Sequence, residues 1–270
     1  MGEQQQHSGG SWMSAVSRRV IPALLMDQAR LVKTRSFRRA AYVGDPINTI
    51  LVFNDKGCDE LLLLDIGASR RGSGPDIDTI RAVASECFMP LAYGGGITSV
   101  GHAEALFACG VEKLVVRSAA QQDPGLITEL ASRFGSQAVV VAIDVDRSRS
   151  GELIGFGERG PKTSGCVAIQ SRLTQAVESG AGEVMVQSVK ADGNLDGPDS
   201  EVAELLRELA VPTIYGGGIA SDDDMRSVFA MGIDAVAVGA HFVFYGPHRA
   251  VLITYPTRHE LAGIGVIDEP

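Results

Sequence analysis

Two copies of a glycine-rich segment carry the residues best suited to binding an anion. The run Pro90-Leu-Ala-Tyr-Gly-Gly-Gly-Ile97 recurs as Pro212-Thr-Ile-Tyr-Gly-Gly-Gly-Ile219. Consecutive glycines let the backbone approach a ligand and turn N–H groups towards it, and the following helix N-terminus adds a favourable dipole. The next run after each copy ends in small residues, Ser118-Ala-Ala120 and Gly239-Ala240. We expect a long ligand with a phosphate at each end, although such glycines can also serve only to make tight turns.

Carboxylates that follow apolar runs are the candidates for proton transfer. Asp144 ends the run Val139-Val-Val-Ala-Ile-Asp144, which suits a general acid or base, and capping the next loop is its alternative role. Asp65 and Asp192 stand at or after two other runs, where they could contact a ligand or organise loops. When the two halves of the chain are aligned, Ala142-Ile-Asp144 corresponds to Ala23-Leu-Leu25. One half therefore presents an acid where the other presents a leucine.

These groups need strands to position them, and short apolar runs alternate with amphipathic stretches along the chain. Eight strands are expected, at Val20–Leu25, Glu60–Ile66, Met89–Tyr93, Lys113–Val116, Val139–Val145, Glu183–Ser188, Pro212–Tyr215 and Ala235–Gly239. Helices are expected between them, for example at Asp78–Cys87, Gly101–Cys109 and Ser200–Leu209. The alternation predicts parallel βα units, and eight units predict a (βα)8 TIM barrel with its function at the C-terminal strand ends. The internal repeat favours pseudo-twofold half-barrels over the main alternative, an open doubly wound sheet.

Composition limits the classes of partner. The net charge of −9 and isoelectric point near 5.1 argue against nucleic-acid binding, and the apolar runs are too short to span a membrane. The polar residues 1–17 read as a disordered extension without a signal peptide, so we expect a single domain over residues 18–270 in the cytoplasm. The four widely spaced cysteines indicate reduced, mostly buried thiols, and no metal or other cofactor is implied.

Charged residues begin four of the expected strands. Arg19, Glu60, Lys113 and Glu183 stand at the starts of the first, second, fourth and sixth strands. They could form a closed ring of two positive and two negative charges at the bottom of the barrel. A purely structural ring of ion pairs is one interpretation of this pattern.

Ten short motifs together carry a specific family resemblance. They are Arg19-Val-Ile-Pro22, Leu31-Val-Lys33, Gly44-Asp-Pro46, Asp59-Glu-Leu61, Leu64-Asp-Ile66, Tyr93-Gly-Gly-Gly-Ile97, Arg133-Phe-Gly-Ser-Gln137, Val141-Ala-Ile-Asp144, Gly180-Ala-Gly-Glu183 and Asp192-Gly193. Through them, essentially residues 18–248 resemble the synthase (cyclase) subunit of imidazole glycerol phosphate synthase. The resemblance implies a cyclase-lyase in which ammonia, released from glutamine by a glutaminase partner, attacks a bis-phosphorylated ribonucleotide.

The resemblance also assigns roles to residues. It implies that Asp144 and Lys33, the lysine of a mobile first loop, are catalytic. The phosphate-site positions that it implies are Gly95, Gly96, Ser118, Gly217, Gly218, Gly239 and Ala240. Beside them we expect Asp192 to help bind a phosphate and Asp65 to contact the ligand. It identifies the ring of Arg19, Glu60, Lys113 and Glu183 as a gate for ammonia, and the partner would bind at this N-terminal face of the barrel.

The chain departs from the family pattern at two positions. The first catalytic aspartate of the family falls at Leu25, which cannot transfer a proton, and a neighbouring asparagine is replaced by Arg117. Asp27 follows, but we expect it to point elsewhere. Losing a general acid or base typically costs about 10²–10⁴-fold in rate.

A divergent branch of the family has similar features. The matching stretches are Leu24-Leu25, Leu31-Val-Lys-Thr34 and Tyr42-Val-Gly-Asp-Pro-Ile-Asn48. That branch is associated with surface-polysaccharide synthesis, where barrel and glutaminase supply ammonia to a separate enzyme that forms amidino sugars. This resemblance implies an ammonia-conducting subunit with a sugar amidotransferase as a further partner. A true histidine-pathway cyclase, a noncatalytic barrel that activates its glutaminase, and a phosphate-binding isomerase are the alternatives.

Overall fold

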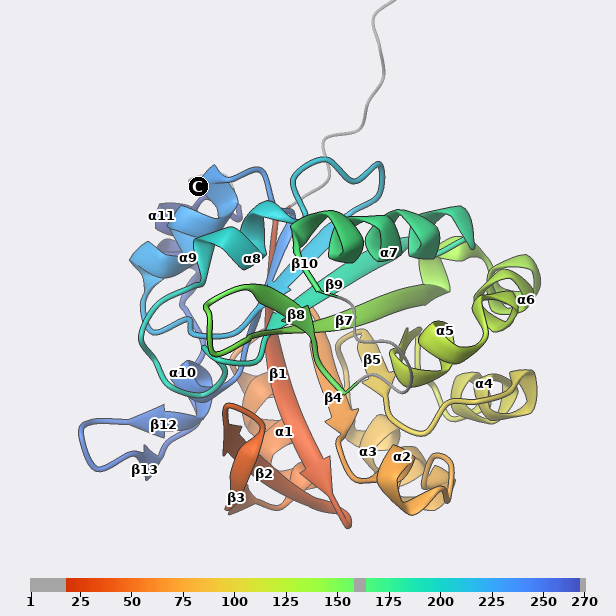
Figure 1. Cartoon of the computed structure of the whole chain (residues 1–270). Coiled ribbons are helices and arrows are strands. Elements are labelled where there is room, and N and C mark those ends of the chain that lie inside the picture. The colour runs from red at the N-terminus through yellow and green to blue at the C-terminus, as the bar shows by residue number, and fades with distance from the viewer. Residues whose placement is uncertain (1–17, 158–163, 268–270) are drawn as a thin grey trace, which may run out of the picture.

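The computed structural model describes residues 18–157 and 164–267 as a barrel of strands surrounded by helices (Figure 1). The extension that we expected to be disordered, residues 1–17, lies outside the described residues. Eight parallel strands form the barrel in the order β1, β4, β5, β6, β7, β9, β10 and β11. Strand β11 then pairs with β1, where Arg19 lies opposite Ala235. This pairing closes the sheet, so the prediction of a (βα)8 barrel is confirmed and the open sheet is excluded.

All eight expected barrel strands are present, and their ends lie within two residues of the prediction. Their bounds are β1 Arg19–Asp27, β4 Leu61–Asp65, β5 Leu91–Gly94, β6 Lys113–Val116, β7 Val139–Arg147, β9 Glu183–Ser188, β10 Thr213–Gly216 and β11 Ala235–Val238. The strands read as continuous apolar runs because both of their faces are covered, one by the barrel interior and one by helices.

The helices form the outer layer of the barrel. Their bounds are α1 Pro46–Asp55, α2 Ala68–Arg71, α3 Ile77–Glu86, α4 Val100–Ala108, α5 Ser118–Gln122, α6 Pro124–Phe134, α7 Cys166–Glu178, α8 Ser200–Glu204, α9 Asp222–Ala230, α10 Ala240–Val243 and α11 Arg258–Ile264, with a short 3₁₀ helix, η1, at Ser136–Ala138. Many helices begin after a polar residue whose side chain accepts a backbone N–H bond, as Ser99 does before α4 and Ser221 before α9. Helix α8 is five residues shorter than expected, because i→i−3 hydrogen bonds such as Leu206 to Ala203 tighten the chain after it.

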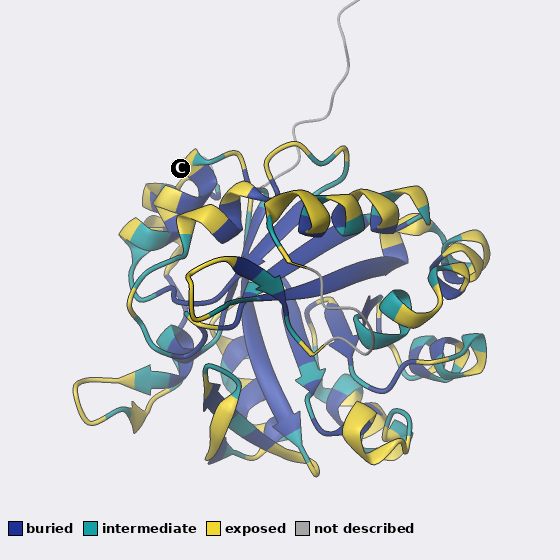
Figure 2. Ribbon diagram, in the orientation of Figure 1, coloured by how far each residue is buried: buried dark blue, intermediate teal, exposed yellow. Residues whose placement is uncertain are grey.

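Two hydrophobic cores hold the layers together. The larger lies between the strands and the helices, so the strands are buried while the helices expose only their outer faces (Figure 2). The smaller fills the barrel interior and consists of Ile21, Ala23, Leu62, Ala92, Val115, Val140, Ala142, Met185, Ile214, Ala235 and Ala237. Five of these eleven interior side chains are alanines, so small groups make up nearly half of the lining of the barrel axis.

Two hairpins and a short strand decorate the barrel and were not predicted. The first βα connection forms a hairpin of β2 (Arg30–Arg35) and β3 (Arg38–Gly44) on the edge of β1. Strand β8 (Leu153–Gly155) pairs with β7, and β12 (Phe244–Tyr245) pairs with β13 (Ala250–Val251). The many arginines of the first hairpin conceal the alternation of apolar and polar residues that is typical of a strand. The other three strands have only two or three residues each, too few to show such an alternation.

The four cysteines were expected to be reduced and mostly buried. All four cysteines are free, but only Cys58 is buried, Cys87 and Cys109 are partly buried and Cys166 is exposed. The expectation of mostly buried thiols was therefore wrong, because Cys166 opens α7 on the outer surface of the barrel.

Among the described helices, none is both long and apolar enough to cross a membrane.

Candidate active site

The predicted site residues come together in one cavity at the C-terminal end of the barrel. The cavity measures about 700 Å³, a size typical of small-molecule sites. Every residue that we expected at the ligand site lines it, namely Lys33, Asp65, Gly95, Gly96, Ser118, Asp144, Asp192, Gly217, Gly218, Gly239 and Ala240. Ala23, Ala142 and Ala237 of the interior core also line the cavity, so its floor reaches into the barrel.

The two triple-glycine turns are built alike and tolerate no side chain at their ends. Gly95 and Gly96 have φ values of 135° and 67°, and Gly217 and Gly218 have values of 111° and 84°. A Cβ on Gly95 would lie 2.5 Å from the Asp65 carbonyl oxygen, and one on Gly218 would lie 1.9 Å from that of Gly197. Glycine is therefore required at both turns by conformation and by space. The exposed N–H groups of such turns suit an anion.

A short helix begins beside each turn, on the neighbouring strand. Helix α5 starts at Ser118 after β6, and α10 starts at Ala240 after β11. The residues before them, Arg117 and Gly239, have similar backbone angles of φ −116°, ψ −77° and φ −105°, ψ −80°. The internal repeat of the sequence thus corresponds to two similar pairs of turn and helix, which could hold the two ends of a bis-phosphorylated ligand.

Lys33 reaches one of these ends from the first hairpin. A Cβ on Gly239 would lie 2.8 Å from the Lys33 Nζ, so the glycine leaves the space that the ammonium group occupies. Lys33 is buried, and its Nζ donates to Asp192 Oδ1 over 2.9 Å. Thr34 donates to the other oxygen of Asp192 over 3.0 Å, and Gln187 donates to Oδ1 over 3.2 Å. Asp192 therefore fixes Lys33, which lies on strand β2 rather than in an open loop.

Asp144 lines the same cavity from strand β7. It alternates with Val140 and Ala142 along β7, so its carboxylate points inwards at the top of the barrel. Arg117 Nη1 donates to its Oδ2 over 2.8 Å. Burial raises the pKa of Asp144 to about 6, although Arg117 lowers it, and the charge of Asp192 raises it further. A carboxyl group with a pKa near neutrality is suited to proton transfer.

Leu25 also lines the cavity, whereas the nearby acid of β1 does not replace it. Asp27 is absent from the cavity lining, and its Oδ1 accepts a bond of 2.7 Å from Arg71. Arg71 also bonds both carboxylate oxygens of Asp65, at 3.1 and 3.0 Å. Asp65 further accepts the N–H groups of Gly67 and Ala68 at 2.9 Å each, so it organises the loop after β4. The expectation that Asp27 points elsewhere is thus confirmed.

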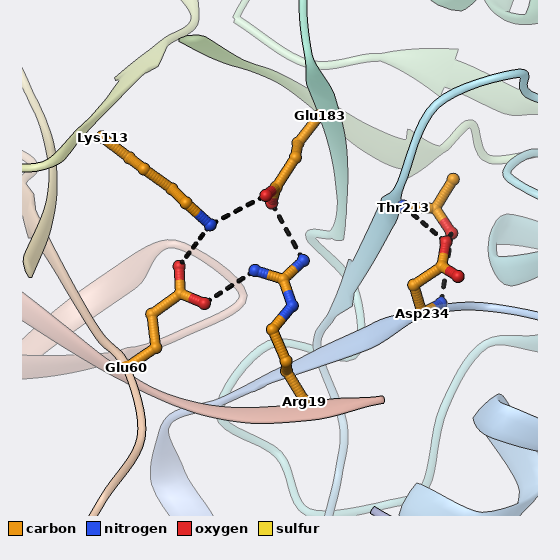
Figure 3. A network of polar contacts seen from close by, with 6 residues as sticks. All are labelled: Arg19, Glu60, Lys113, Glu183, Thr213 and Asp234. Atoms are coloured by element: carbon orange, nitrogen blue, oxygen red, sulfur yellow. Dashed lines mark hydrogen bonds and ion pairs between the residues drawn. The ribbon is translucent and has the colours of Figure 1, made fainter. Parts of the chain in front are cut away.

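At the opposite end of the barrel, the four charged residues form a closed ring (Figure 3). Arg19 bonds Glu60 over 2.7 Å and Glu183 over 3.0 Å, and Lys113 bonds the same carboxylates over 3.1 and 2.8 Å. Burial alone would lower the pKa of Arg19, but the two glutamates outweigh it and raise the pKa. Along β1 the inward side chains run from Arg19 through Ile21 and Ala23 to Leu25, a distance of roughly 20 Å at the rise of a strand.

Three residues of the cavity were missed or undervalued at the level of sequence. Phe37 and Phe156 line the cavity and contact each other edge to face, with ring centroids 5.3 Å apart. Both stand in short polar or glycine-rich stretches, where an isolated aromatic residue was the available signal. In the sequence, Arg117 stood out only because it replaces an asparagine of the family. Its bond to Asp144 depends on β6 and β7 lying side by side, which the sequence alone does not reveal. Within the described ranges, no three His, Cys, Asp or Glu side chains gather to hold a metal ion.

Comparison with known proteins gives consistent matches along the barrel. The model of the family described as "Histidine biosynthesis protein" matches residues 19–248. The chain is 45% identical over 249 residues to a provisionally named imidazole glycerol phosphate synthase subunit, hisF2, of Pseudomonas aeruginosa, covering 91% of this chain and 98% of that protein. It is 42% identical over 247 residues to a provisionally named HisF subunit of Leptospira interrogans, covering 90% and 96%. Identity to the HisF subunit of Helicobacter hepaticus is 35% over 241 residues, covering 89% and 96%.

Proposed function

Because the chain belongs to the histidine biosynthesis protein family, together with the HisF subunits of imidazole glycerol phosphate synthase, we propose that it is a cyclase-type synthase subunit of a glutamine amidotransferase complex. It accepts ammonia from a glutaminase partner at the ring end of the barrel. Its cavity binds a ligand with a phosphate at each end, through Gly95, Gly96 and Ser118 at one end and Gly217, Gly218, Gly239 and Ala240 at the other. Asp192 joins the second of these ends, where it holds Lys33 beside Gly239, and Asp65 and Asp144 are further contacts to the ligand.

The residue pair of Leu25 and Asp144 supports a specialised form of this function. Both side chains line the cavity, but only Asp144 can transfer a proton. The ring at the bottom is complete, with ion pairs of 2.7 to 3.1 Å around it. A route for ammonia combined with one missing acid suits a subunit that conducts ammonia without the usual cyclisation. We therefore propose that it supplies ammonia to a sugar amidotransferase for amidino-sugar formation.

Sequence similarity supports this specialised role in a second way. Identity is higher to the provisionally named subunits of Pseudomonas aeruginosa and Leptospira interrogans, at 45% and 42%, than to the Helicobacter hepaticus subunit, at 35%. A separate branch within the family would give this difference. The competing function is a true cyclase-lyase of histidine biosynthesis, and the pKa of Asp144 near 6 favours it, since one well-placed acid–base group remains.

The fate of the glutamine amide nitrogen separates the two functions. The full chain would be combined with its glutaminase partner and given the bis-phosphorylated ribonucleotide and glutamine labelled with nitrogen-15 in the amide. The specialised function predicts that glutamine is hydrolysed while the label accumulates as ammonia. Label in an imidazole product would establish the cyclase. Ligand-stimulated hydrolysis that persists after the ring is disrupted would instead indicate a barrel that only activates its partner.

A further inference from the structure

Arg117 occupies a position where one end of the ligand site meets Asp144. It is the last residue before α5, whose first residue, Ser118, is part of the proposed phosphate site. From there its side chain reaches Asp144 on the next strand, with a distance of 2.8 Å between Nη1 and Oδ2. The Arg117 side chain is 35% exposed and lines the cavity, whereas the Asp144 side chain is only 9% exposed. The guanidinium can therefore move towards the cavity more easily than the carboxylate can move away.

A guanidinium group has more donors than Asp144 uses. It carries five N–H groups in a planar fork, and the bond to Asp144 involves one of them. This fork matches the oxygens of a phosphate or sulfate group, which can take two bonds side by side. Since Arg117 directly precedes Ser118 and lines the same cavity as the proposed phosphate-binding glycines Gly95 and Gly96, an anion bound there would compete with Asp144 for the same guanidinium.

Asp144 has little other compensation for its charge within the described part of the chain. The other charged or titratable groups that line the cavity are Lys33 from β2, Asp65 from β4, Arg70 from α2, His102 from α4 and Asp192 from the loop after β9. Lys33 bonds Asp192, and Arg70 is the highly exposed member of an ion pair with Asp27. The charge of Asp192 opposes ionisation of Asp144, so Arg117 is the cation that favours it.

We propose that Arg117 is a displaceable counter-ion, so that an anionic group of the ligand that engages its guanidinium breaks the ion pair and leaves the buried Asp144 carboxylate to bind a proton. The proton comes from solvent, and the O–H bond that forms on Asp144 replaces its contact with Arg117. Removing one partner of a buried ion pair leaves an uncompensated charge, which is costlier near neutral pH than protonating a carboxylate. This inference builds on the phosphate sites of the proposed function, but it requires neither turnover nor a glutaminase.

The consequence for chemistry is a change in what Asp144 offers the ligand. While it is paired with Arg117, the carboxylate can only accept hydrogen bonds. After displacement it carries a proton that it can donate to a group inside the cavity. Anion binding and protonation are thereby coupled, with up to about one proton taken up for each ligand bound and released when the ligand leaves.

The test follows the Asp144 carboxyl carbon by carbon-13 NMR in the full chain as the pH is changed. Its signal is assigned by its loss in Asp144→Asn. Sulfate serves as the probe, because it resembles phosphate but stays a dianion around neutral pH. We expect sulfate to raise the pKa of Asp144 in the wild type. In Arg117→Gln the pKa should already be raised without sulfate, and sulfate should not raise it further. Arg117→Lys retains the charge, so it should restore the pKa most of the way.

A matched control and an independent signal make each outcome informative. Arg133→Gln also removes one arginine from an ion pair, with Glu104 on the outer helices, and should leave the pKa of Asp144 unchanged. The amide signals of Gly95, Gly96 and Ser118 report whether sulfate binds. If they move while the pKa of Asp144 does not, displacement is overturned and the phosphate site stands. If sulfate moves neither, displacement and the phosphate site both fail. An unchanged pKa in Arg117→Gln would overturn the role of Arg117 without any ligand.

Discussion

Leu25 and Asp144 occupy equivalent places at the mouth of the barrel, near the ends of β1 and β7. Each follows by two residues an alanine of the barrel interior, Ala23 or Ala142, and both line the same cavity. The two half-barrels therefore present a methyl-bearing side chain and a carboxylate at matching positions. This difference is the structural basis of the proposal that the chain conducts ammonia but does not use it for cyclisation.

Restoring an acid at Leu25 tests that division directly. We expect Leu25→Asp to increase ammonium-dependent cyclisation of the bis-phosphorylated ribonucleotide by at least about 10-fold, towards the 10²–10⁴-fold that a general acid or base contributes. The matched control is Leu25→Asn, which has a similar size and polarity but cannot take up a proton. Equal activity in the two variants would show that the missing carboxylate does not limit the reaction.

Reversing one charge of the ring should separate the two sources of ammonia. Glu183 bonds both Arg19 and Lys113, so Glu183→Lys places three positive charges around one glutamate. In the reconstituted complex, we expect product formation from glutamine to fall more than product formation from added ammonium. Dissolved ammonium can enter from the open cavity, whereas ammonia from glutamine must pass the ring. Glu104→Lys, which reverses a charge in a surface ion pair with Arg133, is the control. A loss of equal size with both sources would contradict a gate.

The close packing of the glycine turns predicts unequal costs for two similar substitutions. Gly218 has φ +84° and a Cβ there would meet the Gly197 carbonyl, whereas Gly246 has φ +69° and open space around it. Gly246→Ala should cost only the strain of a left-handed residue, about 1–2 kcal/mol in the free energy of unfolding. Gly218→Ala should cost clearly more and should also weaken phosphate binding. Urea denaturation and phosphate titration measure both effects, and equal costs would refute the close approach.

The raised pKa of Asp144 predicts how stability depends on pH. Its ordinary value is 3.8 and its value in the folded protein is about 6, so the folded state holds this proton more tightly than the unfolded state does. Protonated Asp144 therefore stabilises the folded state fully below about pH 4, and this stabilisation is lost as the pH rises through about 6. The loss is on the order of 3 kcal/mol, given about 1.4 kcal/mol for each pH unit.

Asp144→Asn removes this titration and should be compared with the wild type by urea denaturation at about pH 4 and about pH 8. We expect the variant to gain stability relative to the wild type as the pH increases. Parallel pH profiles would mean that the carboxyl group is not held in its neutral form by burial.

The sequence predicted the barrel well because its signals are local. Each strand has a short apolar core, Val139–Ile143 in β7 and Val184–Val186 in β9 for example, and one closed parallel sheet accommodates eight such strands. The triple glycines were predictive because their φ values and close contacts leave few other residues possible. The ring could be listed from strand starts, but its closure by ion pairs depends on the tilt of the strands around the barrel.

Features that depend on distant or mixed signals were missed. The β2–β3 hairpin contains Arg30, Arg35, Arg38 and Arg39, whose long side chains obscure an alternating pattern. The pairing of Arg117 with Asp144 joins residues 27 positions apart and became visible only once their strands were adjacent. Helix α11 has a local signal, the capping box of Thr257 and Glu260, although no helix was predicted there.

Turnover by the full chain alone, with the bis-phosphorylated ribonucleotide, excess ammonium and no glutaminase, shows whether the barrel cyclises its ligand. Binding of the ribonucleotide would be measured in parallel by calorimetry. We expect the ligand to bind without being cyclised, because both glycine turns proposed to bind phosphate are present while Leu25 cannot transfer a proton. Robust formation of imidazole glycerol phosphate would contradict it, and would mean that Asp144 and its neighbours suffice for an ordinary synthase reaction.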